Sequence, residues 1–293
     1  MAEQVAQARA ARPVSAGPSL VKRMRKWDLG KNAILIVLVV LTFYPFVAML
    51  FMSVKDNTQF YHERWIPSWP MHFENFGYAW TAIHQYILNS IFTSSVSALG
   101  AVVFAALSAY VIARFEFPGR NLIYMAIIAL MMIPGILTLV PRFLLVRDLG
   151  LLNTYWVLIL PWTAGAQAFG ILLLRTFFES LPGELFESAR LDGAGELQVL
   201  WRIAAPLSAP ILGTLAIMSV LGTWNEVIWP SVTVSSDNLK TIVFGLWGFQ
   251  GTYYQSWGPL NAAYVLSSIP LIILFAFTSR LFIQGLTSGA LKV

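Results

Sequence analysis

Cysteine is absent from this chain of 293 residues, and histidine occurs only three times. The absence of cysteine excludes disulfides, thiol nucleophiles and cysteine-ligated metals. The three histidines (His62, His72 and His84) share one segment, which argues against a histidine-rich metal centre. We therefore expect neither a metal site nor a cofactor.

Charged residues are also scarce, at 11% of the chain, whereas a soluble domain carries about 25%. Hydrophobic residues make up 57% of the chain, and the mean hydropathy is +0.68. This composition predicts a surface that faces mostly lipid. The net charge of +5 is typical of the cytoplasmic Lys and Arg of a membrane protein, so no nucleic-acid partner is predicted.

Six apolar runs are long enough to cross a bilayer, whose hydrocarbon core of about 30 Å needs about 20 helical residues. None of them contains Lys or Arg, and only the fifth contains an acid, Glu226. The sequence therefore predicts an all-α polytopic membrane protein with six transmembrane helices. The predicted spans are residues 33–53, 87–113, 121–140, 155–174, 208–229 and 259–279.

The basic residues predict the orientation, because cytoplasmic segments carry an excess of Lys and Arg. With the N-terminus inside, only five of the 19 Lys and Arg residues lie outside: Lys55, Arg64, Arg142, Arg147 and Lys240. Both termini are thus predicted to be cytoplasmic. A seventh span within the uncharged run 241–279 would place the C-terminal bases outside, so we expect its first half to be an outer loop with a partial helix.

Residues 1–30 are predicted to form a flexible cytoplasmic tail that ends in the basic cluster 22–26. A cleaved signal peptide fits less well, because its apolar region would have about 7–15 residues and this run covers residues 33–53. Residues 31–293 then form one six-span domain, which includes a cytoplasmic loop at 175–207.

The loop 175–207 joins the fourth and fifth predicted spans. Ser180 is expected to cap a first helix, with Pro182 and Glu184 in its first turn. This helix has an apolar face and a charged face. The apolar face carries Leu185, Phe186 and Ala189, and the charged face carries Glu184, Glu187 and Arg190.

A break at Asp192-Gly193 is predicted to end this first helix, since glycine adopts backbone conformations that cost other residues more. Asp192 is then expected to cap a second helix, which Pro206 ends before the fifth span. The predicted geometry is a helix, a sharp turn and a helix against the inner membrane face. By composition alone, an ordinary interfacial amphipathic connection explains the loop equally well.

The spacing within this loop resembles the EAA loop of the permease subunits of ABC importers. That pattern is Glu-Ala-Ala, three residues, Gly, nine residues and Ile-x-Leu-Pro. Two positions depart from it, Ser188 at the middle alanine and Ala205 at the leucine. The matching positions are Glu187, Ala189, Gly193, Ile203 and Pro206.

Further matches cover most of the chain and resemble permeases of the carbohydrate-uptake family, in particular the second, shorter permease subunit of maltose-type transporters. Only the N-terminal tail falls outside the resemblance. The matching segments are Pro134-Gly135, Pro141, Leu149-Gly150-Leu151, Asn153-Thr154, Trp224-Asn225-Glu226, Trp229-Pro230 and the ending 285–292.

The resemblance implies a non-catalytic transmembrane subunit of an ATP-driven importer for a sugar or oligosaccharide, in a bacterial-type plasma membrane. It also implies three partners: a cytoplasmic ATP-binding subunit dimer, a second related permease and an extracytoplasmic solute-binding protein. The chain has no Gly-x-x-x-x-Gly-Lys-Ser/Thr loop, so ATP hydrolysis is expected in a partner. A coupling helix would contact that ATPase through Glu184, Glu187, Ala189, Asp192, Gly193 and Ala194.

Trp224, Asn225 and Glu226 are the candidates for the substrate path. Acids inside a membrane are costly and usually face a cavity or a partner, although a position at the membrane interface explains Glu226 as well. Pro134-Gly135 and Pro161 are expected to interrupt helices that line the path or simply to kink them. The aromatic residues of the outer segments fit either sugar stacking or an interfacial belt.

Three other classes of protein fit the sequence less well. A secondary transporter for a small polar solute would need ion-coupling acids deep in several spans, and only Glu226 is available. An intramembrane hydrolase would need a paired catalytic constellation, and no histidine lies in a predicted span. A passive scaffold would leave the spacing from Glu187 to Pro210 unexplained.

Overall fold

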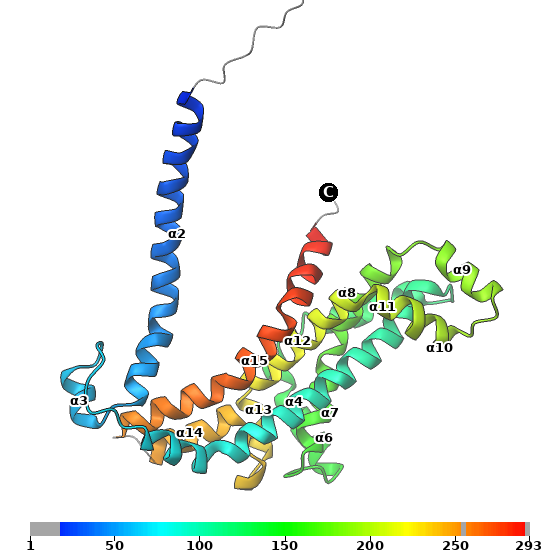
Figure 1. Ribbon diagram of the computed structural model, residues 1–293. Coiled ribbons are helices and arrows are strands. Elements are labelled where there is room, and N and C mark those ends of the chain that lie inside the picture. Colours follow the sequence, from blue (N-terminus) through cyan, green and yellow to red (C-terminus); the bar gives the residue numbers. More distant parts are fainter. Residues whose placement is uncertain (1–17, 253–255, 291–293) are drawn as a thin grey trace, which may run out of the picture. The chain divides into compact units, whose positions relative to one another are not determined.

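A computed structural model describes the backbone of residues 18–252 and 256–290, and the side chains of residues 30–251 and 256–280. Every regular element in those ranges is a helix (Figure 1), which confirms the all-α prediction. Contacts divide the chain into two units, Met1–Leu50 and Phe51–Val293.

The first unit contains most of helix α2 (Pro18–Ser53). Its large apolar side chains from Ile34 to Leu50 are exposed on all sides, which is the pattern of a helix that lies in lipid. The helix begins at Pro18, so the described part of the predicted tail, residues 18–30, is helical.

By length and composition, the described residues give up to six spans, in agreement with the prediction. Three are single helices: Gly30–Ser53 within α2, Glu74–Arg114 (α4), and Trp257–Arg280 within α15 (Trp257–Ala290). The other three are bent pairs of helices, each counted as one span. They are Arg120–Leu130 with Gly135–Asp148 (94°), Trp156–Gly165 with Gln167–Glu179 (42°), and Glu196–Leu207 with Ala209–Asn225 (83°).

The first bent pair consists of α5 (Arg120–Leu130), the short helix η2 (Gly135–Thr138) and α6 (Leu139–Asp148). The break falls immediately before Gly135, so the predicted interruption at Pro134-Gly135 is confirmed. Pro134 lacks the N–H that would continue the helix.

The second bent pair is formed by α7 (Trp156–Gly165) and α8 (Gln167–Glu179), with Pro161 inside α7. A proline removes the hydrogen bond to the carbonyl four residues earlier, which here belongs to Val157. The indole N–H of Trp229 donates to that carbonyl oxygen at 2.8 Å instead. Trp229 belongs to α13 (Ile228–Thr233), so this bond ties a short helix after the fifth span to the fourth.

The third bent pair ends the second loop helix at Leu207, one residue after Pro206, so the predicted end before the fifth span is confirmed. The chain stays helical through α10 (Glu196–Val199), a π turn at Leu200–Ala204 and α11 (Ala205–Leu207), and α12 (Ala209–Asn225) follows. In the π turn the Ala205 N–H bonds to the Leu200 oxygen, five residues back. This wider turn directly precedes Pro206, where the ordinary i→i−4 donor is missing.

In the second unit, α4 lies at the centre and contacts α7, α8, α12, α14 (Ile242–Thr252) and α15. Glycines allow the closest approaches. A Cβ at Gly170 would lie 2.7 Å from the Cβ of Ala105, and one at Gly100 would lie 2.9 Å from Thr163. Helix α14 is the partial helix predicted in the run 241–279.

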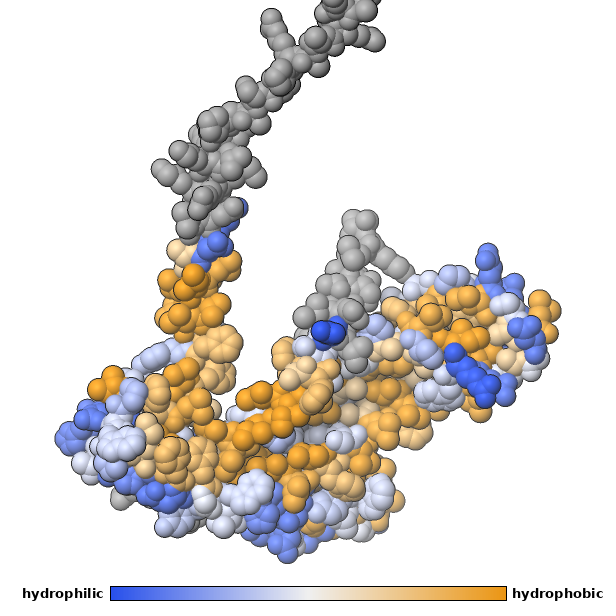
Figure 2. Space-filling model, in the orientation of Figure 1, coloured by the Kyte–Doolittle hydropathy of each residue, from blue (hydrophilic) through white to orange (hydrophobic). Residues whose placement is uncertain are grey.

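The surface of this unit has the polarity of a membrane protein (Figure 2). A broad apolar surface covers its helices, and hydrophilic side chains gather over α9 (Glu184–Leu191) and α10 at one end and over loops at the opposite end. Such a surface is typical of a helical bundle that lies in lipid and exposes its two ends to water. Which end is cytoplasmic remains a prediction.

Candidate functional site

The loop between the fourth and fifth spans folds into α9, a sharp turn and α10. Gly193 has a φ of +81° and follows the last turn of α9. Its N–H bonds to the Arg190 oxygen at 3.0 Å, and the Ala194 N–H bonds to the Ala189 oxygen at 3.0 Å. These two bonds and the left-handed glycine form a Schellman motif, so the predicted turn at Gly193 is confirmed.

The predicted caps of both helices are wrong. The Ser180 hydroxyl donates to the Phe177 oxygen at 2.7 Å, at the end of α8, and Gly183 occupies the N-cap of α9. Asp192 is the C-cap of α9, whereas the second helix begins three residues after Gly193, at Glu196, behind Gly195. The Gly195 N–H bonds to the side-chain oxygen of Gln198 at 3.1 Å. A glycine therefore stands at the start of each helix, where a polar capping side chain is more usual.

The buried face of α9 packs on the end of α4. Phe186 and Ala189 are buried in one cluster with Tyr110 and Phe178. The guanidinium carbon of Arg114 lies 3.8 Å from the centre of the Phe186 ring, at the distance of a cation–π contact. Arg114 also donates to the oxygens of Phe178, in the last turn of α8, and Leu181, just after that helix. Leu185, predicted on this face, is 41% exposed.

A second contact connects α10 to the same end of α4. The Tyr110 hydroxyl donates to Glu196 Oε2 at 2.8 Å, and Arg190 Nε donates to Glu196 Oε1 at 2.8 Å. The hydrogen bond that Arg190 donates to Glu196 raises the pKa of Arg190 above its ordinary value. One carboxylate thus joins α9, α10 and α4, and Arg190, although exposed, is paired with Glu196.

The outward surface of α9 and α10 combines exposed acids with two exposed leucines. Leu191 is 89% exposed and Leu197 is 64% exposed. Of the six residues predicted to contact an ATPase, Ala194 is half-buried and Ala189 is buried in the core cluster. The other four are exposed on this surface: Glu184, Glu187, Asp192 and Gly193.

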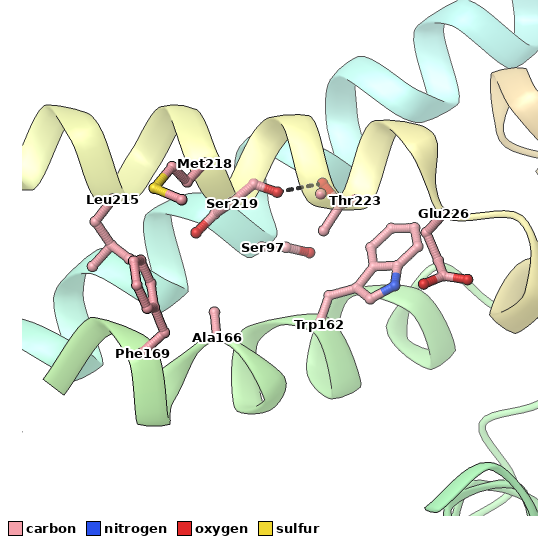
Figure 3. Close-up of a pocket in the computed structure, with 10 residues that line it drawn as sticks. Ser97, Trp162, Ala166, Phe169, Leu215, Met218, Ser219, Thr223 and Glu226 are labelled. Atoms are coloured by element: carbon pink, nitrogen blue, oxygen red, sulfur yellow. Dashed lines mark hydrogen bonds between the residues drawn. The ribbon is translucent and has the colours of Figure 1, made fainter. Parts of the chain in front are cut away.

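A cavity of about 340 Å³ lies between α4, the bent pair α7–α8 and α12 (Figure 3). One end of it is apolar, with Phe169, Leu215 and Met218. The other end is polar, with Trp162 and Glu226 near one another. The remaining lining residues are Ser97, Ala166, Ser219, Gly222 and Thr223.

The polar end has one buried donor without a partner and one carboxylate. No residue in the described part of the chain accepts a hydrogen bond from Trp162 Nε1. Glu226 Oε1 accepts the backbone N–H groups of Ile228 at 3.0 Å and Trp229 at 3.2 Å. Glu226 is therefore the C-cap of α12 and holds the start of α13, instead of lying within a span.

The three predicted substrate-path residues line two cavities, since Trp224 and Asn225 both line a second cavity beside α14. Trp224 is buried in a cluster with Ile83 and Leu246, away from the first cavity. Asn225 is exposed and donates to the Leu221 oxygen of its own helix at 2.8 Å. Of the three, only Glu226 lines the first cavity.

Sequence reasoning missed the other polar lining residues, Ser97, Trp162, Ser219 and Thr223. They come from three helices that are distant in sequence, so no spacing connects them. The unpaired indole of Trp162 and the apolar surroundings of Glu226 become apparent only once the helices are packed.

Comparisons with known proteins agree with this architecture. The family described as "binding-protein-dependent transport system inner membrane component" matches residues 101–288. The probable ABC transporter permease protein YurM of Bacillus subtilis is 34% identical over 92% of this chain and 92% of its own. The diacetylchitobiose uptake system permease protein NgcG of Streptomyces coelicolor is 32% identical over 92% of this chain and 90% of its own.

A solved structure shares the fold. It comes from a crystal structure of a bacterial ABC transporter involved in the import of the acidic polysaccharide alginate. The match has a TM-score of 0.76 at 24% identity and covers 87% of this chain and 96% of that one. With the bundle of spans and the helical loop before the fifth span, the family match identifies this chain as a member of the inner membrane permease components of binding-protein-dependent transport systems.

Proposed function

We propose that this permease subunit docks on a separate cytoplasmic ATPase through the outward surface of α9 and α10, and that it carries a sugar or oligosaccharide. A second related permease completes the translocation path, and an extracytoplasmic solute-binding protein delivers the solute. ATP hydrolysis takes place in the ATPase dimer and drives alternating access.

The observation that carries the docking proposal is the attachment of α9 and α10 to α4. Arg114 and Tyr110 hold the inner side of this element, while Glu187, Asp192, Leu191 and Leu197 remain exposed on its outer side. An amphipathic helix that shows both acids and leucines suits a groove with basic residues in a partner. Force applied to this surface would pass directly into the longest helix of the bundle.

The carbohydrate assignment is supported by the chemistry of the cavity. It is lined by three hydroxyl side chains, an indole and one carboxylate, next to apolar walls. A sugar offers both hydroxyl groups and apolar C–H faces to such a site. The name of the relative NgcG, which refers to diacetylchitobiose uptake, points to the same class of solute. Polyols and glycerol-phosphate diesters are the solutes to test against it.

The docking proposal is tested by purifying the tagged chain from its native membrane and identifying its partners by mass spectrometry. Glu187→Lys is compared with Glu116→Lys, which reverses one acidic charge in the exposed loop between α4 and α5. We expect the ATPase to be lost with Glu187→Lys only, while the second permease is retained by both variants. Equal ATPase recovery in both variants would refute docking through α9.

The carbohydrate proposal is tested on the solute-binding protein that co-purifies with the complex. Its thermal stability is measured with neutral oligosaccharides, free polyols and sn-glycerol 3-phosphate. Stabilisation by an oligosaccharide supports the proposal, and stabilisation by sn-glycerol 3-phosphate alone would overturn it.

A further inference from the structure

We propose that the cavity between α4, α7–α8 and α12 is a water-accessible solute subsite in which Glu226 selects neutral or cationic hydroxylated solutes and disfavours anionic ones. This inference rests on the proposed function and narrows its substrate class. It assigns a specificity-determining role to a residue at the junction of α12 and α13.

The polar end of the cavity presents a donor and an acceptor together. Figure 3 shows the Trp162 indole and the Glu226 carboxylate at the same end. A buried N–H group without a partner is costly and is relieved by an acceptor that enters the site. A hydroxyl group can accept from Trp162 and donate to Glu226 at once, because it is both a donor and an acceptor. A carboxylate or phosphate oxygen without a proton can only accept.

The charge of the cavity points in the same direction. Among the described residues that line it, Glu226 alone is charged. Arg142 is an electrostatic neighbour of Glu226, but its guanidinium carbon lies 3.8 Å from the centre of the Trp229 ring, and it does not line the cavity. An anion in the cavity therefore meets the like charge of Glu226, whereas a neutral or cationic solute does not.

The size of the cavity limits what can occupy it. Its volume of about 340 Å³ is at the lower end of the range of roughly 300–1,000 Å³ found for ligand sites. The apolar end, formed by Phe169, Leu215 and Met218, can contact the C–H face of a ring.

The absence of cysteine makes a direct test practical. Gly222 lines the cavity one turn before Glu226, and a Cβ added there meets no described atom within 4 Å. Gly222→Cys is placed in the whole transporter, in native membrane vesicles, and treated with three methanethiosulfonates. These reagents transfer a 2-hydroxyethyl group (neutral), a 2-(trimethylammonio)ethyl group (cationic) or a 2-sulfonatoethyl group (anionic) to the thiol. Labelling is read from the intact mass of this chain, and each rate is divided by that of the same reagent with free 2-mercaptoethanol.

We expect the neutral and cationic reagents to react faster than the anionic one. Glu226→Gln in the same background should slow the cationic reagent and speed the anionic reagent by about threefold each, the effect of one nearby charge in water. Gly77→Cys, at an exposed site on α4 where an added Cβ also meets no described atom within 4 Å, is the control. Its rates should not respond to Glu226→Gln.

Ser219→Cys repeats the test at a second lining position, in case Gly222→Cys does not assemble. No labelling at either position, while Gly77→Cys reacts, would overturn the water-accessible subsite. Labelling without a change on Glu226→Gln would overturn the role of Glu226. ATPase recovery in the same preparations reports separately on docking through α9, so failure of one proposal is distinguishable from failure of the other.

Discussion

Trp229 donates its indole N–H to the carbonyl oxygen of Val157 at 2.8 Å, and this is the carbonyl that Pro161 leaves without a helical donor. A side chain from α13 thus replaces a backbone bond that the sequence of α7 cannot make. The relationship explains how a proline is accommodated inside the fourth span. It also makes α13 a structural part of that span.

Trp229→Phe should therefore destabilise the protein by about 1–3 kcal/mol, the cost of leaving a buried acceptor unpaired. Pro161→Ala is the matched partner, since it restores the N–H that can reach Val157. We expect Trp229→Phe to cost less in the Pro161→Ala background, as measured by denaturant unfolding in detergent. An equal cost in both backgrounds would show that the two residues are not coupled.

Tyr110→Phe removes the hydrogen bond to Glu196 and keeps the aromatic packing. We expect the free energy of unfolding to fall by about 1.5–3 kcal/mol, which is typical of a hydrogen bond to a charged group. We also expect less solute to be transported per ATP hydrolysed, because α10 loses its bond to α4. Transport and hydrolysis are measured together in proteoliposomes of the whole complex. Tyr124→Phe is the control, because that hydroxyl makes no hydrogen bond within the described part of the chain. Unchanged coupling in Tyr110→Phe would contradict the assignment.

Gly193→Ala should lower the free energy of unfolding by about 1–2 kcal/mol, because the φ of +81° at this position is unfavourable for a residue with a Cβ. Nothing in the described structure crowds that Cβ, so the cost is one of backbone conformation alone. Gly77→Ala is the control, with an equally open site inside α4 and a φ outside the left-handed region. Thermal unfolding of both variants is the measurement, and equal melting temperatures would rule out strain at the turn.

Gly170→Ala should lower the free energy of unfolding by about 1–3 kcal/mol, the usual range for overpacking. The reason is that the new Cβ would lie 2.7 Å from the Cβ of Ala105. Ala105→Gly in the same chain removes the collision and should recover most of the loss. Gly165→Ala, where no described atom lies within 4 Å of the added Cβ, should have little effect. Failure of Ala105→Gly to rescue would place the cost of Gly170→Ala elsewhere.

The spans and the turn at Gly193 were predictable because each depends on local chemistry. A run of apolar residues needs lipid, and a glycine between two polar helical segments permits a left-handed turn. The break at Pro134-Gly135 follows from the missing proline N–H in the same way.

The failed predictions involve helix boundaries or packing between distant helices. Ser180 lies at the C-cap of α8, three residues before the N-cap position of α9, which Gly183 occupies. The cavity beside Glu226 exists only where three helices meet, so no spacing in the sequence predicts it.

Helix α4 is fastened near both ends. Near its start, Asn75 donates to the oxygens of Ser53 and Lys55 at 3.0 Å each, and near its end Tyr110 and Arg114 hold α10 and α9. Its 41 residues form a rod of about 60 Å at 1.5 Å per residue. Such a rod works as a lever: a tilt of about 5° displaces one end by about 5 Å relative to the other. A displacement of α9 by about 5 Å would thus tilt α4 by about 5° about its opposite end, and the whole length of the helix would carry this movement through the bundle.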